Sequence, residues 1–381
     1  MYINRVQINY SLLFLAVIAS FEFIYRFSLY PLLKNFDELI ILLLPLIFIS
    51  KYDRIFSLFV VSIVFISITN DFSFTQLVLD IKFFLLSFFA IVLTRYEGNK
   101  YSDRFFIYYF YLVIAVFLFE LLLNQTYESI LLGDYIATYY IGEVEYHRFS
   151  SIFVHPGELA LYCVSSIVAL FSLKVKAKVK YSVCFILLLF LILSFQRFEI
   201  LTFFSLLIVF YVCGRFWYLG SLIILLLTSF ILYGSFIYFS FFEQMYLDQD
   251  YDPRTAMYIA SFDIFSQNYI NGIGAGNFAS HMSVGNYQYY DLTGISNLWW
   301  FDGARYLTDT FWPKIFSEYG SLGFFLYVSV FYYLIRISKQ NKWLVFIILY
   351  LFLLSLQSPI VFNTYLVLYS FLVVSYSMRK N

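Results

Sequence analysis

Residues 181–213 read YSVCFILLLFLILSFQRFEILTFFSLLIVFYVC, two apolar runs that meet at the short polar stretch Gln196-Arg197-Phe198-Glu199. Each run, about 181–195 and 198–213, approaches the ~20 residues that an α-helix needs to cross the hydrocarbon core of a bilayer. Two such runs joined by a turn of a few residues predict a helical hairpin that crosses a membrane twice. Arg197 lies in the turn, at the predicted membrane surface.

The composition of the whole chain supports this interpretation. Of its 381 residues, 62% are hydrophobic and 13% are charged, whereas soluble domains are about half apolar and a quarter charged. These values exclude disorder, nucleic-acid binding and a disulfide-built secreted scaffold. The 24 Lys and Arg residues balance the 24 Asp and Glu residues, and the three cysteines lie in apolar runs without metal or redox spacing.

Further apolar runs on both sides extend the pattern over the whole chain. They predict an all-α, polytopic integral membrane protein with about twelve transmembrane helices and a single transmembrane domain over residues 1–381. The predicted spans are about 9–29, 36–50, 55–70, 75–94, 104–123, 156–173, 181–195, 198–213, 217–241, 313–335, 343–357 and 360–378.

The distribution of Lys and Arg sets the predicted orientation. With both termini in the cytoplasm, most basic residues fall on the inner side, including the KVKAKVK run at 174–180. Two larger loops, about 124–155 and 243–312, then face outward. Connections of the second loop's length usually carry function or fold separately, so we expect the chemistry on the outer face.

From residue 124 onward, four arginines on the outer side oppose this charge rule: Arg148, Arg197, Arg254 and Arg305. A guanidinium offers a planar fork for bidentate contacts with phosphate. Each arginine taken alone is equally explained by a nearby carboxylate or by snorkelling at the interface. The four together favour a shared anionic ligand.

Other outer-face residues are candidates for proton transfer. His155 precedes Pro156, whose position suits a helix start, and Glu158 complements the dipole of that helix. His155 titrates near neutral pH and is a candidate acid, base or hydrogen-bond donor. Asp309 could receive a proton from a sugar hydroxyl, or could simply cap the helix that begins near Trp312.

At these residues the chain resembles the O-antigen polymerase and ligase superfamily of bacterial envelope glycosyltransferases. RFSSIFVHPGELA, from Arg148, is similar to the family segment that ends in His-Pro-Gly or His-Pro-Asn, although Ser151 stands where Gly is usual. LSFQRFEIL resembles the Ser-Arg-Gly turn, with Gln196 and Phe198 replacing Ser and Gly. RTAMYIASFDIFSQNYINGIGAGNF, from Arg254, is like the Arg-led helix that ends in a glycine-rich turn.

A fourth motif separates polymerase from ligase. Asp309-Thr310, nine residues, Gly320, two residues and Gly323 follow the spacing of a ligase motif that begins with histidine. Because Asp309 replaces that histidine, the resemblance favours a polymerase.

The resemblance implies a metal-independent, GT-C-like glycosyltransferase without a cofactor, in the bacterial inner membrane with its active site facing the periplasm. It would transfer a growing glycan from undecaprenyl diphosphate to the non-reducing end of a new lipid-linked repeat unit. Its partners would be these lipid-linked oligosaccharides, membrane lipid and a chain-length-regulating co-polymerase, and no nucleic acid. The implied residues are, for catalysis, Asp309, Arg197, Arg254 and Arg148, and for substrate binding, Arg305, His155, Glu158 and Tyr319.

Two alternatives remain from the sequence. An O-antigen ligase would move finished glycan to another acceptor. A flippase for lipid-linked oligosaccharide would be expected to show repeated halves and charged or broken helices at mid-membrane. The long outer loop and the absence of a visible sequence repeat disfavour the flippase.

Overall fold

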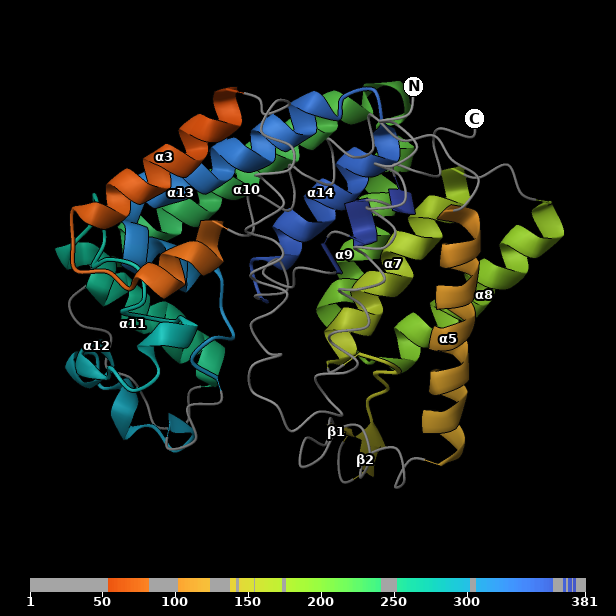
Figure 1. Cartoon of the computed structure of the whole chain (residues 1–381), viewed down its shortest axis with the longest axis horizontal. Helices are drawn as coiled ribbons and strands as arrows, with labels where there is room; N and C mark the ends of the chain where they lie inside the picture. Colours follow the sequence, from red (N-terminus) through yellow and green to blue (C-terminus); the bar gives the residue numbers. More distant parts are fainter. Residues whose placement is uncertain are drawn as a thin grey trace, which may run out of the picture.

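The computed structural model describes most of the chain from Arg54 onward: residues 54–81, 102–123, 138–141, 144–153, 155–172, 176–240, 252–301 and 306–358, and a few positions between 366 and 374. The elements in these ranges are mostly helical (Figure 1). They are α3 (Arg54–Ile68), α5 (Ser102–Leu122), β1 (Thr138–Ile141), β2 (Val144–His147), α7 (Pro156–Ser172), α8 (Ala177–Leu193), α9 (Arg197–Val212), η4 (Gly214–Phe216), α10 (Trp217–Ser240), α11 (Pro253–Gln267), η5 (His281–Ser283), α12 (Gln288–Leu292), η6 (Ile295–Asn297), α13 (Trp312–Ile337) and α14 (Lys342–Leu354).

Each predicted span that the structure describes is helical, whereas α11 and α12 lie in the predicted loop 243–312. The predicted hairpin at 181–213 is α8 followed by α9, and α5, α7, α10, α13 and α14 begin and end within about four residues of the expected positions. The predicted spans at 9–29 and 36–50 lie outside the described residues, as do most of those at 75–94 and 360–378. The total of twelve therefore stays a prediction.

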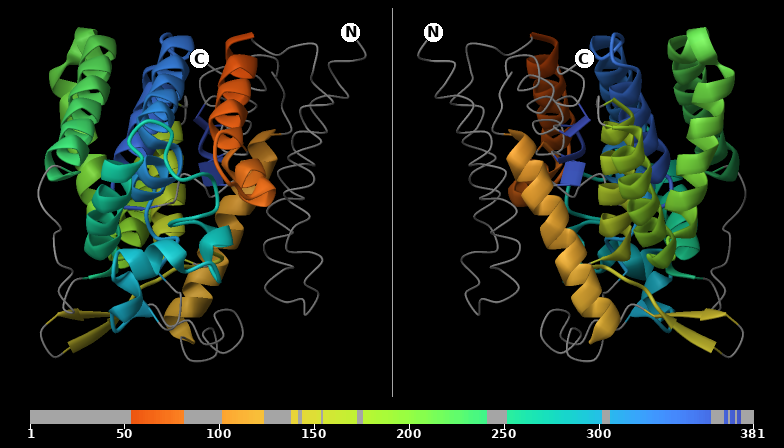
Figure 2. Two further views of the ribbon diagram at one scale, coloured as in Figure 1. Left: turned by 90° about the vertical axis from the view of Figure 1, so that its left-hand side faces the viewer. Right: turned by 90° about the vertical axis from the view of Figure 1, so that its right-hand side faces the viewer.

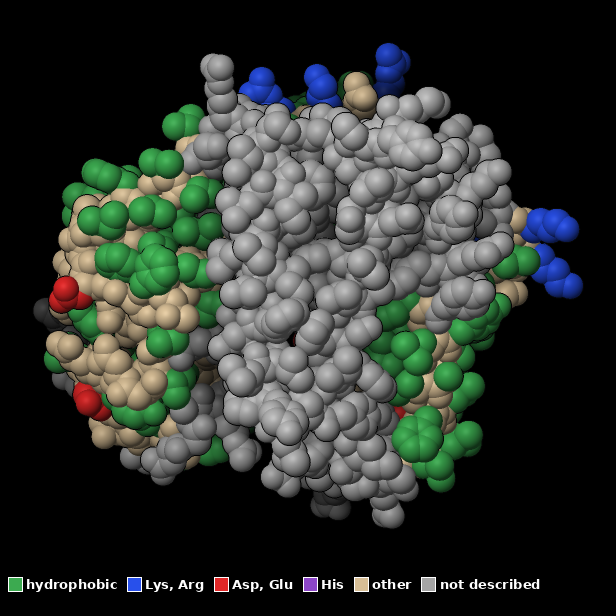
Figure 3. Space-filling model, viewed as in Figure 1, with side chains coloured by type: hydrophobic (Ala, Val, Ile, Leu, Met, Phe, Trp, Pro, Cys, Tyr) green, Lys and Arg blue, Asp and Glu red, His purple; other side chains and the backbone are tan. Residues whose placement is uncertain are grey.

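Two described stretches, Gly214–Phe239 and Trp312–Ile337, are long and apolar enough to cross a membrane, and the described residues also include shorter apolar helices. The main helices run side by side as a tilted bundle (Figure 2). Large apolar side chains such as Leu58, Val61 and Phe65 of α3 are exposed on its flank. Lys and Arg side chains appear along the top and upper right edges in Figure 3, away from the end that carries the β1–β2 hairpin.

The two larger predicted loops both contain secondary structure. In the loop 124–155, β1 pairs with β2 as an antiparallel hairpin in which Thr138 lies opposite His147. This hairpin is a local exception to the all-α prediction. In the loop 243–312, α11, α12 and the 3-10 turns surround a small apolar core that includes Met257, Phe278 and Tyr290. The described part of this loop thus has a small core of its own.

The helix α13 is interrupted at Gly320, whose φ of 60° and ψ of −156° are not helical. The backbone groups released there pair with the glycine-rich turn after α11. Ser321 donates to Tyr269 O at 2.8 Å, and Ile273 donates to Ser317 O at 2.8 Å. A Cβ on Gly320 would lie 2.5 Å from Ile270 O, so only glycine fits this crossing.

Buried charges on α13 are paired. Lys314 contacts Asp80 directly and lies 3.8 Å from Glu318. A Glu318 oxygen accepts hydrogen bonds from the backbone N–H groups of Gly276 at 2.7 Å and Phe278 at 3.2 Å. This network ties the glycine-rich turn to α13 and explains how carboxylates persist in an apolar segment.

Candidate active site

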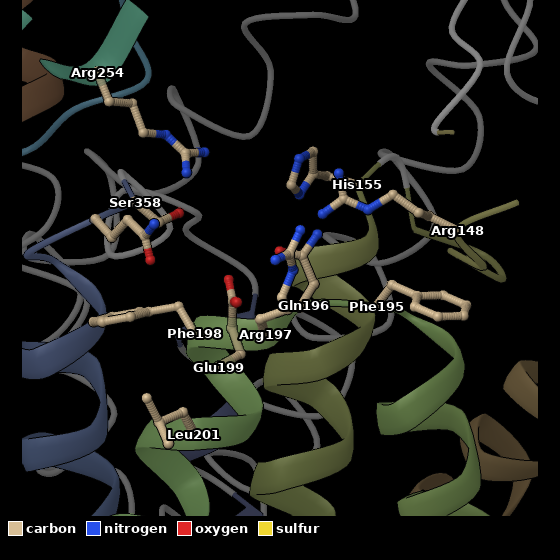
Figure 4. A pocket seen from close by; sticks show the side chains of 11 residues that line it. Arg148, His155, Phe195, Gln196, Arg197, Phe198, Glu199, Leu201, Arg254 and Ser358 are labelled. Carbon is tan, nitrogen blue, oxygen red and sulfur yellow. The ribbon is translucent and has the colours of Figure 1, made fainter. Parts of the chain in front are cut away.

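The three outer arginines that the structure describes, Arg148, Arg197 and Arg254, line one pocket (Figure 4). Its volume of about 470 Å³ falls within the ~300–1,000 Å³ of typical small-molecule sites. Four parts of the sequence, far apart in the chain, form its wall. The complete lining is Arg148, His155, Phe195, Gln196, Arg197, Phe198, Glu199, Leu201, Arg254, Gln357 and Ser358.

Glu120 of α5 holds the turn that presents Arg148. Its fully buried carboxylate accepts hydrogen bonds from the backbone of Ser150 at 2.9 Å and Ser151 at 2.6 Å, and contacts His147 Nε2 at 2.9 Å. Ser151 has a φ of 55°, a left-handed conformation that glycine adopts more readily. The backbone at this position therefore explains why the related motif carries glycine there.

The second arginine comes from the start of α9. Phe195 has a φ of 50° and turns the chain sharply between α8 and α9, so the exposed Arg197 opens the new helix at the pocket wall. Gln196 stands just before it. In the amide orientation that satisfies its neighbours, its oxygen accepts from Arg148 at 2.8 Å and its nitrogen donates to Glu199 at 3.2 Å. Gln196 thus connects two charged residues of the pocket.

His155 lies between the arginines as a neutral side chain. The backbone N–H of Gly157 donates to its Nδ1 at 3.0 Å, so the ring proton is assigned to Nε2. Burial lowers the pKa of His155 to about 4, and the charges of Arg148 and Arg254 act in the same direction. At neutral pH His155 is therefore a hydrogen-bond donor and a poor proton acceptor.

Arg254 occupies the first turn of α11, which Asp252 caps through hydrogen bonds from Arg254 N and Thr255 N. Its guanidinium lies 3.9 Å from Asp309, and both side chains are over a third exposed. Burial raises the pKa of Asp309, while the charge of Arg254 opposes that shift. Phe311, and not Asp309, is the N-cap residue of α13, so the alternative that Asp309 caps this helix is wrong.

Backbone dipoles reinforce the positive charge of the pocket. The helices α7, α9 and α11 begin at Pro156, Arg197 and Pro253, beside residues of its wall. A helix N-terminus carries roughly half a positive charge. Three arginines against one carboxylate, Glu199, leave the lining strongly cationic, which suits a phosphate-bearing ligand.

The other predicted site residues lie apart from this lining. Arg305 is outside the described residues. Glu158 stands in the first turn of α7, partly exposed, and is not among the lining residues. Tyr319 is fully buried and donates to Asp80 in the network on α13. Within the part of the chain that is described, no group of three or more His, Cys, Asp or Glu side chains could hold a metal ion.

Glu199 is the charged residue of the pocket lining that the sequence did not single out. It is 5% exposed, in the first turn of α9 two residues after Arg197. A signal was present, since a carboxylate at the edge of an apolar span is costly and usually functional or paired. Gln357 and Ser358, from the end of the α14 segment, carry no comparable signal.

Fold and site together define a helical membrane protein with an arginine-lined pocket at the ends of its helices. Residues 182–328 match the family model described as O-antigen ligase. The chain therefore carries a domain of the O-antigen ligase and polymerase family, whose members are membrane transferases that act on lipid-linked glycans. The matched range includes Arg197, Arg254 and Asp309, whereas Arg148 and His155 precede it. Comparison with curated proteins and with solved structures gives no match.

Proposed function

We propose that this protein is a repeat-unit polymerase of the bacterial inner membrane. It transfers a growing glycan from undecaprenyl diphosphate to the non-reducing end of a new lipid-linked repeat unit, at the periplasmic face. The observation that carries the proposal is the meeting of Arg148, Arg197 and Arg254 in one pocket. We call these three residues the arginine clamp.

The clamp matches the electrostatic demand of the reaction. When the bond from the anomeric carbon to the diphosphate breaks, negative charge develops on the leaving oxygens. Preorganised positive groups around that charge lower the barrier more than they stabilise the bound donor. Three guanidiniums and the start of α9 supply such groups without a metal ion.

The surface of α9 offers a route for the lipid. Leu201 lines the pocket, and Phe204 and Ile208 follow it on the same face of the helix. All three side chains are exposed, which in a membrane means contact with lipid. A polyprenyl chain can lie along this face while its diphosphate reaches the clamp.

Two features favour a polymerase over the alternatives. Asp309, not histidine, stands beside Arg254, where the resemblance places the ligase histidine. A flippase must move its substrate across the membrane, whereas the pocket sits at the starts of α7, α9 and α11. Periplasmic placement of the pocket follows from the charge bias of the sequence.

The test is reconstitution of the purified protein in liposomes with a defined lipid-linked repeat unit. We expect longer lipid-linked products and free undecaprenyl diphosphate. Arg197→Ala and Arg254→Ala should each lower turnover by about 100-fold or more, and the Lys variants should recover little because a point charge lacks the fork. Arg215→Ala, at an exposed arginine of η4 remote from the lining, serves as the matched control.

Unchanged turnover in both alanine variants would remove the clamp from the mechanism. A wild-type protein that attaches one finished glycan to a different acceptor, without lengthening, would instead identify a ligase.

A further inference from the structure

The transfer also needs a group that receives the proton of the acceptor hydroxyl. Asp309 is the carboxylate predicted from the sequence, but it stands at the rim beside Arg254 and is not among the lining residues. His155 uses Nδ1 to accept from Gly157 N and is a poor base at neutral pH. Among the residues that line the pocket, Glu199 is the carboxylate.

Glu199 is held in a defined position. It projects from the first turn of α9 into the cavity, between Gln196 and Arg197 on one side and Arg254 on the other (Figure 4). In the amide orientation that satisfies its neighbours, Gln196 donates to one of the Glu199 oxygens at 3.2 Å. The backbone oxygen of Glu199 accepts from Tyr350 of α14 at 3.3 Å, so the helix end is also anchored.

A glycine, Gly157, packs beside Glu199. A Cβ on Gly157 would lie 3.3 Å from Glu199 Oε1 and 3.0 Å from His155 Nδ1. Both distances are shorter than ordinary contacts, so any side chain here would press on the carboxylate and the imidazole. Gly157 therefore preserves room beside the two groups.

We propose that Glu199 is the catalytic base of the transfer, a proposal that rests on the polymerase function above. The acceptor hydroxyl oxygen forms a bond to the anomeric carbon of the donor glycan while its proton passes to a Glu199 oxygen. The bond between that carbon and the diphosphate oxygen breaks, and undecaprenyl diphosphate leaves with the bonding electrons. Glu199 then releases the proton to water.

With this assignment, Glu199 and Asp309 have different roles. Glu199 is within the same cavity as all three clamp arginines, so a hydroxyl bound beside it also lies near the scissile bond. Asp309 orients Arg254 at the rim, which makes it a positioning residue. Removing the base should therefore affect turnover, whereas removing the positioning residue should weaken diphosphate binding.

The experiment compares Glu199→Gln with Asp309→Asn in the liposome assay, with inorganic pyrophosphate as a competitive probe of the clamp. Glu199→Gln keeps the size of the side chain. We expect it to lower turnover by about 100-fold or more, to flatten the acidic limb of the pH–rate profile, and to change the pyrophosphate inhibition constant by less than about threefold. Asp309→Asn should weaken pyrophosphate inhibition and retain the acidic limb.

A second variant and a control complete the test. Formate should restore part of the turnover of Glu199→Ala by accepting the proton in place of the missing carboxylate. Asp291→Asn, at an exposed carboxylate of α12, should behave as wild type. Glu199→Gln turnover within about threefold of wild type would overturn the proposal, as would loss of the acidic limb in Asp309→Asn alone. A wild-type protein without any product would instead refute the polymerase function itself.

Discussion

The histidine of the pocket shows how a side chain takes its role from its neighbours. His155 would titrate near pH 6.5 in an unfolded chain, but burial and the adjacent arginines lower its pKa to about 4 in the folded protein. Between these values the unfolded state binds a proton that the folded state does not. Stability must therefore fall as the pH drops through this window, and be unaffected by His155 above it.

We predict that this effect costs the wild type about 2 kcal/mol between pH 7.5 and pH 5. His155→Gln removes the titration, so its stability should decline less over the same range. Thermal unfolding of the detergent-solubilised proteins at both pH values measures the difference. Parallel pH profiles of the two proteins would contradict a neutral His155.

At the same scale, the sequence singles out the three arginines that line the pocket but not Glu199, which lines it with them. Arg148, Arg197 and Arg254 conflict with the charge rule of membrane topology, and this conflict marks them in the sequence alone. Glu199 does not conflict with that rule, and its signal in the sequence is a carboxylate at the edge of an apolar span. Its assignment needs the side-chain geometry, because a carboxylate beside an arginine is equally expected for a simple surface ion pair.

At the level of the elements, the turn between β2 and α7 depends on α5. The carboxylate of Glu120 accepts hydrogen bonds from the backbone N–H groups of Ser150 and Ser151. An amide in its place has only one accepting oxygen. We predict that Glu120→Gln lowers the free energy of unfolding by roughly 1–3 kcal/mol and weakens pyrophosphate inhibition. Arg148→Ala should weaken pyrophosphate inhibition less in the Glu120→Gln variant than in the wild type. A double-mutant cycle measures this difference.

The crossing of α13 with the glycine-rich turn gives a second prediction. Gly320→Ala combines a disallowed backbone conformation with a Cβ 2.5 Å from Ile270 O, so we expect a loss of roughly 3 kcal/mol or more in stability. Gly214→Ala is the matched control: it also has a positive φ, but nothing lies within 4 Å of its Cβ. Its cost should be about 1–2 kcal/mol. Equal melting temperatures of the two variants would show that the crossing is not tight.

Periodicity and span length predict the long helices but not the small elements between them. From the sequence, the residues of the β1–β2 hairpin are predicted only as part of a long loop. TYYI and VEYH are nevertheless rich in residues that favour strands. The break in α13 is similarly hidden, because Gly320 and Gly323 fit either a helix or a turn. The partner that fills the break lies about fifty residues earlier.

For the molecule as a whole, the orientation in the membrane can be measured directly. In a variant without the three native cysteines, Gln288→Cys in the outer loop should react with an impermeant maleimide in intact spheroplasts. Lys178→Cys, at the exposed start of α8, should react only after permeabilisation. The reason is the excess of Lys and Arg on the predicted cytoplasmic side. Reversed labelling would place the clamp on the wrong face for a periplasmic transferase.

Long-range pairing is the part that the sequence could not supply. Asp80 and Lys314 are 234 positions apart and in direct contact, whereas local spacing in the sequence relates Asp80 only to Gln76 and Lys314 only to Glu318. The basic residue nearest to Asp80 in the sequence is Lys82, which is outside the described residues. Spans can be recognised one at a time, but their neighbours are decided by packing across the whole bundle.

The residues of the pocket wall are synthesised at different times. Gln357 and Ser358 belong to its wall, and the hydroxyl of Tyr258 bonds to Leu356 O at 2.6 Å. During synthesis the arginines leave the ribosome long before these last wall residues do. A nascent or truncated chain that stops short of α14 thus has the arginines of the pocket without Gln357 and Ser358 of its wall, and we expect such a chain to lack the proposed activity.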